Sequence, residues 1–190
     1  MDKTIFFFAS SRDIGLTSHY ARQVVDMYKY AQSKGDLFFC VSSVNEQNEG
    51  LWSLVRETIP ATNIISFSGN NLKEAAEKID LKIGAQSSTS VVHVQGLAQV
   101  FALRNLVRKE KIKLVLTVHS FVVKPFLKKI LKGVIAYIMN TRYVEKMIFL
   151  SPFAMRRYPL FSALERQGKI IHMYFPVVSA TQIERISPEG

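Results

Sequence analysis

The sequence contains few of the residues that several common kinds of site require. A single cysteine, Cys40, excludes an internal disulfide, and the apolar run around it indicates a buried thiol in a reducing compartment. The four histidines show no close ligand spacing, so we expect no metal site. One glycine lies between Ser10 and Ser18, which disfavours a dinucleotide-binding turn, and no Gly-Lys-Ser/Thr triplet is present. We therefore expect no bound cofactor.

Long apolar runs and acidic residues are also scarce. No segment reaches the roughly 18 apolar residues of a membrane span, and the apolar stretch Thr4–Ala9 is too short for a signal peptide. We therefore expect a cytoplasmic protein. Asp and Glu number 15 against 25 Lys and Arg, and the formal net charge of +10 suits an anionic partner such as a nucleotide, a lipid phosphate or a nucleic acid.

Two short apolar runs, each ending in polar residues, are the most informative part of what is present. They cover Ser90–Leu97 and Lys113–Ser120, and apolar residues recur at helical spacing across Leu97–Ile112, which predicts a β-α-β unit. Because the strands of such a unit are parallel, their carboxyl ends share one edge of the sheet, where open α/β sheets bind ligands. The candidate site residues at these two strand ends are Gln95, Gly96, His119 and Ser120.

The same alternation of strand and helix extends along the whole chain. Further strands are predicted at Thr4–Ala9, Leu37–Val44, Asn63–Phe67, Lys146–Leu150 and Lys169–Tyr174. Further helices are predicted at Thr17–Ser33, Leu51–Thr58, Asn70–Ile83 and Lys124–Tyr143, with another beginning at Pro152. This pattern predicts an α/β domain with a doubly wound, Rossmann-like parallel sheet and right-handed crossovers. The domain covers residues 1–178, and residues 179–190 have the composition of a linker to a further domain or of a C-terminal tail.

Position separates the histidines into two groups. His93 lies in the middle of a strand between two valines, so we interpret it as a structural histidine with a satisfied hydrogen bond. We interpret His19 and His172 in the same way. His119 ends its strand, where a side chain is exposed to the crevice at the sheet edge, and it is a candidate functional residue.

The order and spacing of several segments resemble the N-terminal domain of the family 4 glycosyltransferases, which have the GT-B fold. The resemblance covers essentially the whole chain. Its segments are Phe7–Ala9, Gly15, Val91–Val94, Leu116–Ser120, Phe149–Ser151 and Ile170–Val178. It implies that this chain is the N-terminal half of an enzyme that transfers a sugar from a nucleotide-sugar donor, with retention of configuration and without a metal.

The resemblance also assigns roles to the candidate residues. His119 would act in catalysis by hydrogen-bonding the donor sugar near its phosphate, and a charged imidazole would favour the departing diphosphate. Gln95 stands where the family usually has a second histidine, and Phe175 stands where it has an asparagine before Pro176. Substrate-binding residues are expected in the loop after the first strand and at later strand ends: Gly15, Leu16, Thr17, Gln95, Gly96, Ser120 and Ser151.

Enzymes of this family build most of the nucleotide-sugar site in a second Rossmann domain, which these 190 residues do not supply. We therefore expect the chain alone to be catalytically inactive. The acceptor would be a saccharide or a lipid-linked sugar in the synthesis of a bacterial capsule, another polysaccharide or a glycolipid. The alternative from a different class is a stand-alone basic module that binds a membrane or a nucleic acid. Against nucleic acid, the basic residues are dispersed and no aromatic-rich RNA motif is evident.

A basic amphipathic stretch at Phe121–Tyr143 is a candidate for membrane contact. Lys124, Lys128, Lys129 and Lys132 recur at helical spacing beside apolar residues. These lysines could face an anionic bilayer, which would place the protein on the inner face of the membrane, close to a lipid-linked acceptor. They could instead be solvated while the apolar face packs on the sheet.

Overall fold

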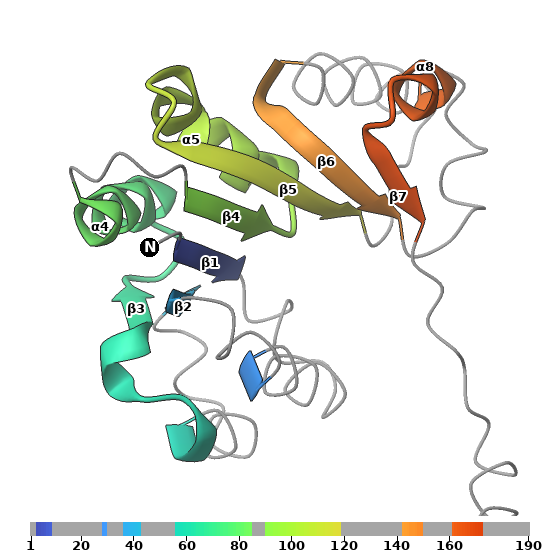
Figure 1. Cartoon of the computed structure of the whole chain (residues 1–190). Helices are drawn as coiled ribbons and strands as arrows, with labels where there is room; N and C mark the ends of the chain where they lie inside the picture. Colours follow the sequence, from blue (N-terminus) through green and yellow to red (C-terminus); the bar gives the residue numbers. More distant parts are fainter. Residues whose placement is uncertain are drawn as a thin grey trace, which may run out of the picture.

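The computed structural model describes residues 3–8, 28–29, 36–42, 56–84, 90–118, 142–149 and 161–172. Within these ranges the chain alternates between strands and helices (Figure 1). The strands are β1 (Lys3–Phe8), β2 (Asp36–Ser42), β3 (Ile64–Phe67), β4 (Ser90–Val94), β5 (Ile112–Val118), β6 (Val144–Phe149) and β7 (Ile170–His172). The helices are the 3-10 helix η2 (Ala61–Asn63), α4 (Leu72–Ile83), α5 (Leu97–Arg108) and α8 (Phe161–Arg166).

All seven strands are parallel and form one sheet in the order β3-β2-β1-β4-β5-β6-β7. The register places Phe6 of β1 opposite Phe39 of β2 on one side and opposite His93 of β4 on the other. From β1 the chain adds strands in one direction as far as β3, returns past β1, and then adds β4 to β7 in the other direction. This order confirms the predicted doubly wound, Rossmann-like parallel sheet.

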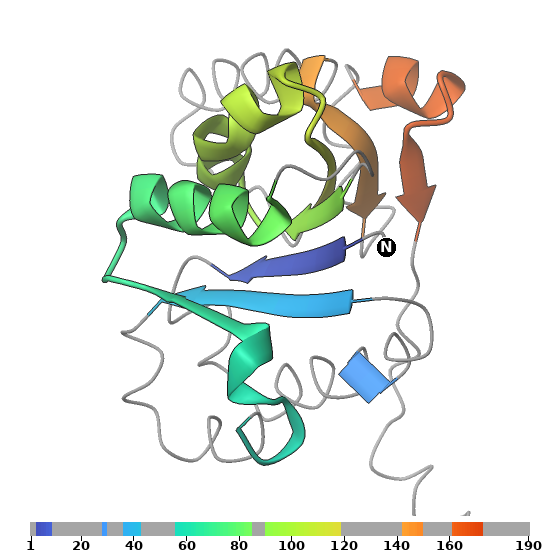
Figure 2. The same cartoon turned by 60° about the vertical axis from the view of Figure 1, so that its left-hand side comes forward.

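The central strands are apolar because both of their faces are covered. In β2, every residue from Leu37 to Ser42 is buried, which explains an apolar run without alternation. Figure 2 shows α4 and α5 on one side of β1 and β2, and residues 28–29 on the other side. The ring of Tyr28 is buried there, with its centroid 6.1 Å from that of Phe39. Both faces of the sheet therefore exclude water from the central strands.

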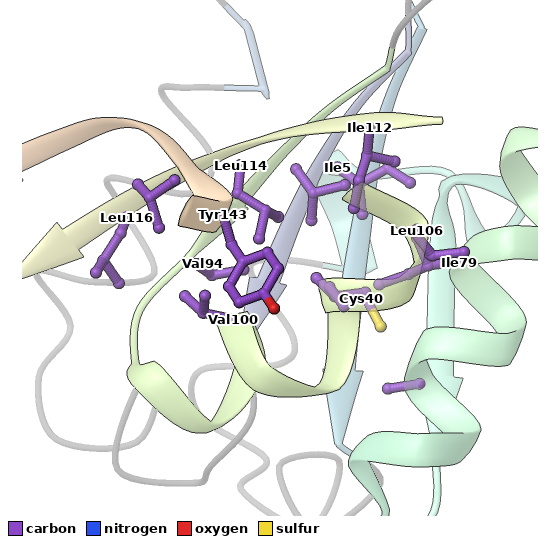
Figure 3. Packing of buried hydrophobic residues seen from close by; sticks show 14 of the residues in the cluster. Ile5, Cys40, Ile79, Val94, Val100, Leu106, Ile112, Leu114, Leu116 and Tyr143 are labelled. Carbon is purple, nitrogen blue, oxygen red and sulfur yellow. The ribbon is translucent and has the colours of Figure 1, made fainter. Parts of the chain in front are cut away.

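Helices α4 and α5 pack on one face of the sheet and enclose the main hydrophobic core (Figure 3). Ala75 and Ile79 of α4 and Val100 and Leu103 of α5 are buried at the predicted helical spacing. The strands contribute Ile5, Cys40, Val92, Val94, Leu114 and Leu116, among others. Burial confirms the predicted core position of Cys40, and it raises the pKa of the thiol because a thiolate would be poorly solvated there.

Helix α5 ends at Arg108, before the predicted limit at Ile112. In the turn that follows, Glu110 has a φ of 55°, and the N–H of Lys111 donates to the carbonyl of Leu106. A residue in the left-handed conformation cannot continue a right-handed helix, so the helix stops here. The turn allows β5 to begin at Ile112 and to enter the sheet beside β4.

Several predicted features lie outside the described residues. They are most of the helices predicted at Thr17–Ser33 and Leu51–Thr58, most of the basic stretch at Phe121–Tyr143, the helix start at Pro152, the boundary between residues 178 and 179, and the structural role of His19. In the part of the chain that the structure describes, no helix combines the length and the apolar character needed to cross a membrane.

Candidate functional site at the carboxyl edge of the sheet

The strand order reverses between β1 and β4, and this reversal locates the candidate site. In open α/β sheets, ligands bind outside the carboxyl ends of the strands at such a topological switch point. Gln95 and Gly96 directly follow Val94, the last residue of β4. These two predicted site residues therefore lie at the switch point.

The turn that carries Gln95 and Gly96 is held by one buried side chain, Gln99. This residue lies in the first turn of α5 and is 2% exposed. Its side-chain oxygen Oε1 accepts a hydrogen bond from the backbone N–H of Gln95 at 2.6 Å and another from that of Gly96 at 2.9 Å. N–H groups at the start of a helix have no partner within the helix. Gln99 therefore caps the N-terminus of α5.

Gly96 is the N-cap residue of α5, and its backbone is extended, with φ −161° and ψ 159°. Any residue can adopt this conformation. A Cβ added at Gly96 would meet Gln99 Oε1 at 4.0 Å, which is an ordinary contact. Neither conformation nor space requires glycine here. The turn therefore lacks the feature by which dinucleotide-binding turns bring bare backbone against a pyrophosphate.

The N-terminus of α4, which follows β3, is also occupied by side chains of the protein itself. Oδ1 of the N-cap residue Asn71 accepts a hydrogen bond from the N–H of Glu74 at 3.2 Å. The Glu74 carboxylate accepts one from the N–H of Ser68 at 3.0 Å and pairs with Lys78 at 2.8 Å. Hydrogen bonds from Lys78 and from Ser68 hold the pKa of Glu74 below its usual value. A carboxylate already complements this positive helix end.

A further contact ties the end of β2 to the turn between β3 and α4. The hydroxyl of Ser42, the last residue of β2, donates to the carbonyl of Gly69. Gly69 has a φ of 50°, in the left-handed region where glycine is favoured. Because Ser42 is fully buried, this bond satisfies a polar group that would otherwise be costly at the sheet edge.

His93 has the structural role that its position in the sequence predicts. It is partly buried in β4, and its Nε2 lies 2.6 Å from Oγ1 of Thr117 on β5. Its ring packs edge-on against Phe6 of β1, with the centroids 5.2 Å apart. Desolvation lowers the pKa of His93 to about 4, so the imidazole is neutral at physiological pH. His172 also has a partner, since its Nε2 lies 3.0 Å from Oε1 of Glu165.

The other predicted site residues lie outside the described residues. They are Gly15, Leu16, Thr17, His119, Ser120 and Ser151, together with Lys124, Lys128, Lys129 and Lys132. The strand that leads to His119 is described as far as Val118 and pairs with β4, so it ends at the same edge of the sheet as Gln95. Among the described residues, no group of three or more His, Cys, Asp or Glu side chains is placed to hold a metal ion.

Sequence reasoning did not identify Gln99, although a local signal for it exists. A Glu or Gln at the third helical position often reaches back to the N–H of the N-cap residue. The complete motif also has Ser or Thr at the N-cap, whose side chain bonds to the third residue. Gly96 has no side chain to complete that exchange, so only half of the pattern is present.

A groove with a volume of about 750 Å³ lies between α4 and α5, apart from the candidate site. Its lining comes from the two helices and from the turn after α5, not from the strand ends. Phe101 lies in this groove and is 55% exposed, although its spacing predicts a place on the apolar face of the helix. The guanidinium of Arg104 lies 3.8 Å from the centre of the Phe101 ring. That stacking shields part of the aromatic surface from water.

Comparison of the sequence with models of known protein families and with curated proteins finds no match.

Proposed function

We propose that this chain is the N-terminal, acceptor-side domain of a retaining, nucleotide-sugar-dependent glycosyltransferase with the GT-B arrangement. The nucleotide sugar is a substrate and not a cofactor. The acceptor is a saccharide or a lipid-linked sugar used to make a bacterial capsule, another polysaccharide or a glycolipid. The observation that carries this proposal is the switch point between β1 and β4, where the polar turn Gln95–Gly96 lies beside the strand that leads to His119.

The segments that resemble the family occupy the middle of the sheet. Val91–Val94 forms most of β4 and Leu116–Val118 ends β5, and these strands pair directly, with His93 opposite Val115. Phe7 lies on β1, on the other side of β4. Because the three strands are parallel, the segments to which the resemblance assigns substrate contacts leave the sheet at one edge. Their convergence supports a single site.

The occupied helix N-termini favour the acceptor side over the donor side for this domain. A nucleoside diphosphate carries negative charge that free N–H groups at a helix N-terminus commonly bind. The N-terminus of α4 is capped by Asn71 and Glu74, and that of α5 by Gln99. This supports an arrangement in which a second domain binds most of the donor.

The described lysines give little support to the alternative of a stand-alone basic module. Lys3 Nζ donates to the carbonyl of Lys82 at 2.7 Å, and Lys82 Nζ donates to that of Thr62 at 3.0 Å. Lys111 Nζ pairs with Asp80 at 2.5 Å. These contacts tie the end of α4 to neighbouring elements. The ammonium groups of these three lysines therefore stabilise the fold around the end of α4. The excess of basic residues alone does not define a binding face.

Peripheral membrane association is the part of the proposal that concerns Lys124, Lys128, Lys129 and Lys132. If they face a bilayer, sedimentation of the protein with vesicles requires anionic lipid and weakens with salt, since exposed charges are screened over about 10 Å at 0.1 M. Replacement of all four by glutamine should abolish the binding. Unchanged binding by that variant would rule out a membrane-facing patch.

The transferase proposal is tested with the full-length gene product. The protein is incubated with radiolabelled uridine-, guanosine- and thymidine-linked sugars, together with membranes and polysaccharide from the source cells. We expect one donor to transfer its label to a lipid or polysaccharide fraction without added metal, and we expect the product to keep the anomeric configuration of the donor. No binding and no transfer with any donor of the panel would contradict the proposal.

A further inference from the structure

We propose that the groove between α4 and α5 binds an amphipathic helix of a partner protein, and that this helix carries acidic residues. The inference goes beyond the proposed function and does not depend on sugar transfer. It rests on the shape of the groove, on the apolar side chains exposed beside it, and on the charges in its walls.

The groove is elongated, because its lining follows two helices that lie side by side (Figure 2). The lining residues extend from Leu72 to Asp80 on α4 and from Ala98 to Lys109 on α5. At a rise of about 1.5 Å per residue, these spans correspond to about 12 and 16 Å along the two helices. The groove is therefore long enough to hold two to three turns of a further helix.

Two large apolar side chains are exposed beside this groove, one on each helix. Phe101 of α5 lines it and is 55% exposed, and Leu81 of α4 is 81% exposed. Leu81 lies four residues after Glu77, which also lines the groove, so the two residues share one side of α4. Apolar side chains that protrude into solvent from both walls are typical of a protein-binding surface, whereas a small-molecule site encloses most of its ligand.

The backbone of the groove favours a helix as the occupant. Nearly all of the lining residues belong to α4 and α5, whose backbone groups are hydrogen-bonded within each helix. An extended segment binds through the free N–H and C=O groups of a sheet edge, which this groove does not offer. A helix satisfies its own backbone groups and can place one apolar face against Phe101 and Leu81.

The carboxylates in the walls already have cationic partners. Glu77 pairs with Lys73 at 3.9 Å, on the same side of α4. Asp80 pairs with Lys111 at 2.5 Å. These two acidic residues are the carboxylates that line the groove, so neither one calls for a basic residue on the partner.

The cations on the α5 wall are not compensated in this way. Among the described residues, no carboxylate pairs with Arg104 or Lys109. The Arg104 guanidinium is held in place, since it stacks on the Phe101 ring and donates to the Phe101 carbonyl at 2.7 Å. Both of these partners are uncharged, so the positive charge stays available to a carboxylate. Acidic residues beside the apolar face of the partner helix would complement both cations.

The test is the binding of designed peptides to the full-length protein, measured by fluorescence anisotropy. The acidic probe is a short peptide, held helical by a chemical staple, with leucines on one face and two glutamates one turn apart beside them. One control peptide has lysines in place of the glutamates, and another has serines in place of the leucines. We expect the wild-type protein to bind the acidic probe, and to bind each control peptide at least roughly tenfold more weakly. Added salt should weaken the binding of the acidic probe.

Variants of the protein locate the binding. Phe101→Ala should weaken the binding of the acidic probe roughly tenfold, because exposed aromatic anchors carry a large share of the energy of an interface. Ile171→Ala removes an exposed apolar side chain from β7 and is the matched control, which should bind as the wild type does. Arg104→Glu should lose affinity for the acidic probe and gain affinity for the lysine peptide, each roughly tenfold. Arg166→Glu on α8 is its matched control and should change neither affinity.

Three results would each overturn the inference: no binding of the acidic probe, equal binding of the lysine peptide, or equal losses in Phe101→Ala and Ile171→Ala. Laurate tests whether the groove takes an acyl chain instead. Saturable laurate binding that Phe101→Ala abolishes, together with no binding of the acidic probe, would assign the groove to a lipid and contradict the proposal. If Phe101→Ala lowers the unfolding temperature, the exchange of charge preference in Arg104→Glu still decides the question.

Discussion

Acid conditions should isolate the contribution of His93 to the stability of the fold. The folded protein lowers the pKa of this imidazole from 6.5 to about 4 by desolvation. Between these two values the unfolded chain binds the proton and the folded chain does not, so the free energy of unfolding decreases as the pH falls. The stability that depends on a neutral His93 is fully present above the pKa of the unfolded chain, 6.5, and is lost progressively as the pH falls toward the folded-state pKa of about 4.

The magnitude follows from the two pKa values. At about 1.4 kcal/mol for each pKa unit, the difference between 6.5 and about 4 corresponds to about 3 kcal/mol in total, reached below the folded pKa. About 2 kcal/mol of this should already be lost between about pH 7 and pH 5. Phe6 and Thr117, which contact the ring, carry no charge, so neither compensates for the cost of protonation.

The assay is urea unfolding of the wild-type protein and of His93→Gln at a series of pH values. Glutamine can keep a hydrogen bond to Thr117, but it does not titrate. As the pH falls from about 7 to about 5, the free energy of unfolding of the wild type should therefore decrease by about 2 kcal/mol relative to the variant. Parallel profiles, or a pKa of His93 close to 6.5 measured by NMR, would refute the reasoning.

Two further predictions concern the stability of the fold: one tests a side-chain contact and the other tests the backbone conformation of two glycines. Thr117→Val removes the hydroxyl beside His93 Nε2 and should lower the free energy of unfolding by about 1–2 kcal/mol at neutral pH, because it leaves a polar ring atom unpaired; an unchanged urea midpoint would contradict the contact. Gly69→Ala should cost about 1–2 kcal/mol because Gly69 has a positive φ, whereas Gly96→Ala should change stability by about 0.5 kcal/mol or less. If the two alanine variants lose the same amount of stability in thermal unfolding, the proposed difference between the backbone conformations of Gly69 and Gly96 is contradicted.

Most of the strands could be predicted from the sequence, because a strand buried on both faces needs a local apolar run. The run from Leu37 to Val41 is of this kind, and the structure places it in β2. Helix α4 could be predicted because Ala75 and Ile79 recur at helical spacing, and its start is close to Asn71, a residue suited to cap it. The end of α5 could not, because it depends on the left-handed conformation of Glu110, a residue type that seldom marks a helix end.

The details of the candidate site depend on contacts between residues that are distant in sequence. The pairing of His93 with Thr117 requires the register of β4 against β5, which an apolar pattern alone does not fix. The switch point requires the order of all the strands, whereas the sequence predicts a doubly wound parallel sheet without fixing which two strands flank the reversal. The place of Gln95 at the carboxyl edge could be predicted, because it follows from the end of a strand. The hydrogen bonds that hold it there come from Gln99, whose local signal is incomplete.

The most direct test of the central claim is the effect of His119→Ala on sugar transfer by the full-length protein, measured together with thermal unfolding. Our account predicts that turnover falls roughly a hundredfold, the scale expected when one preorganised hydrogen-bond donor to a developing charge is lost. It also predicts an unfolding temperature close to that of the wild type, because a side chain at a strand end makes few core contacts. Near-normal turnover, or an unfolding transition that accounts for the lost activity, would contradict the account.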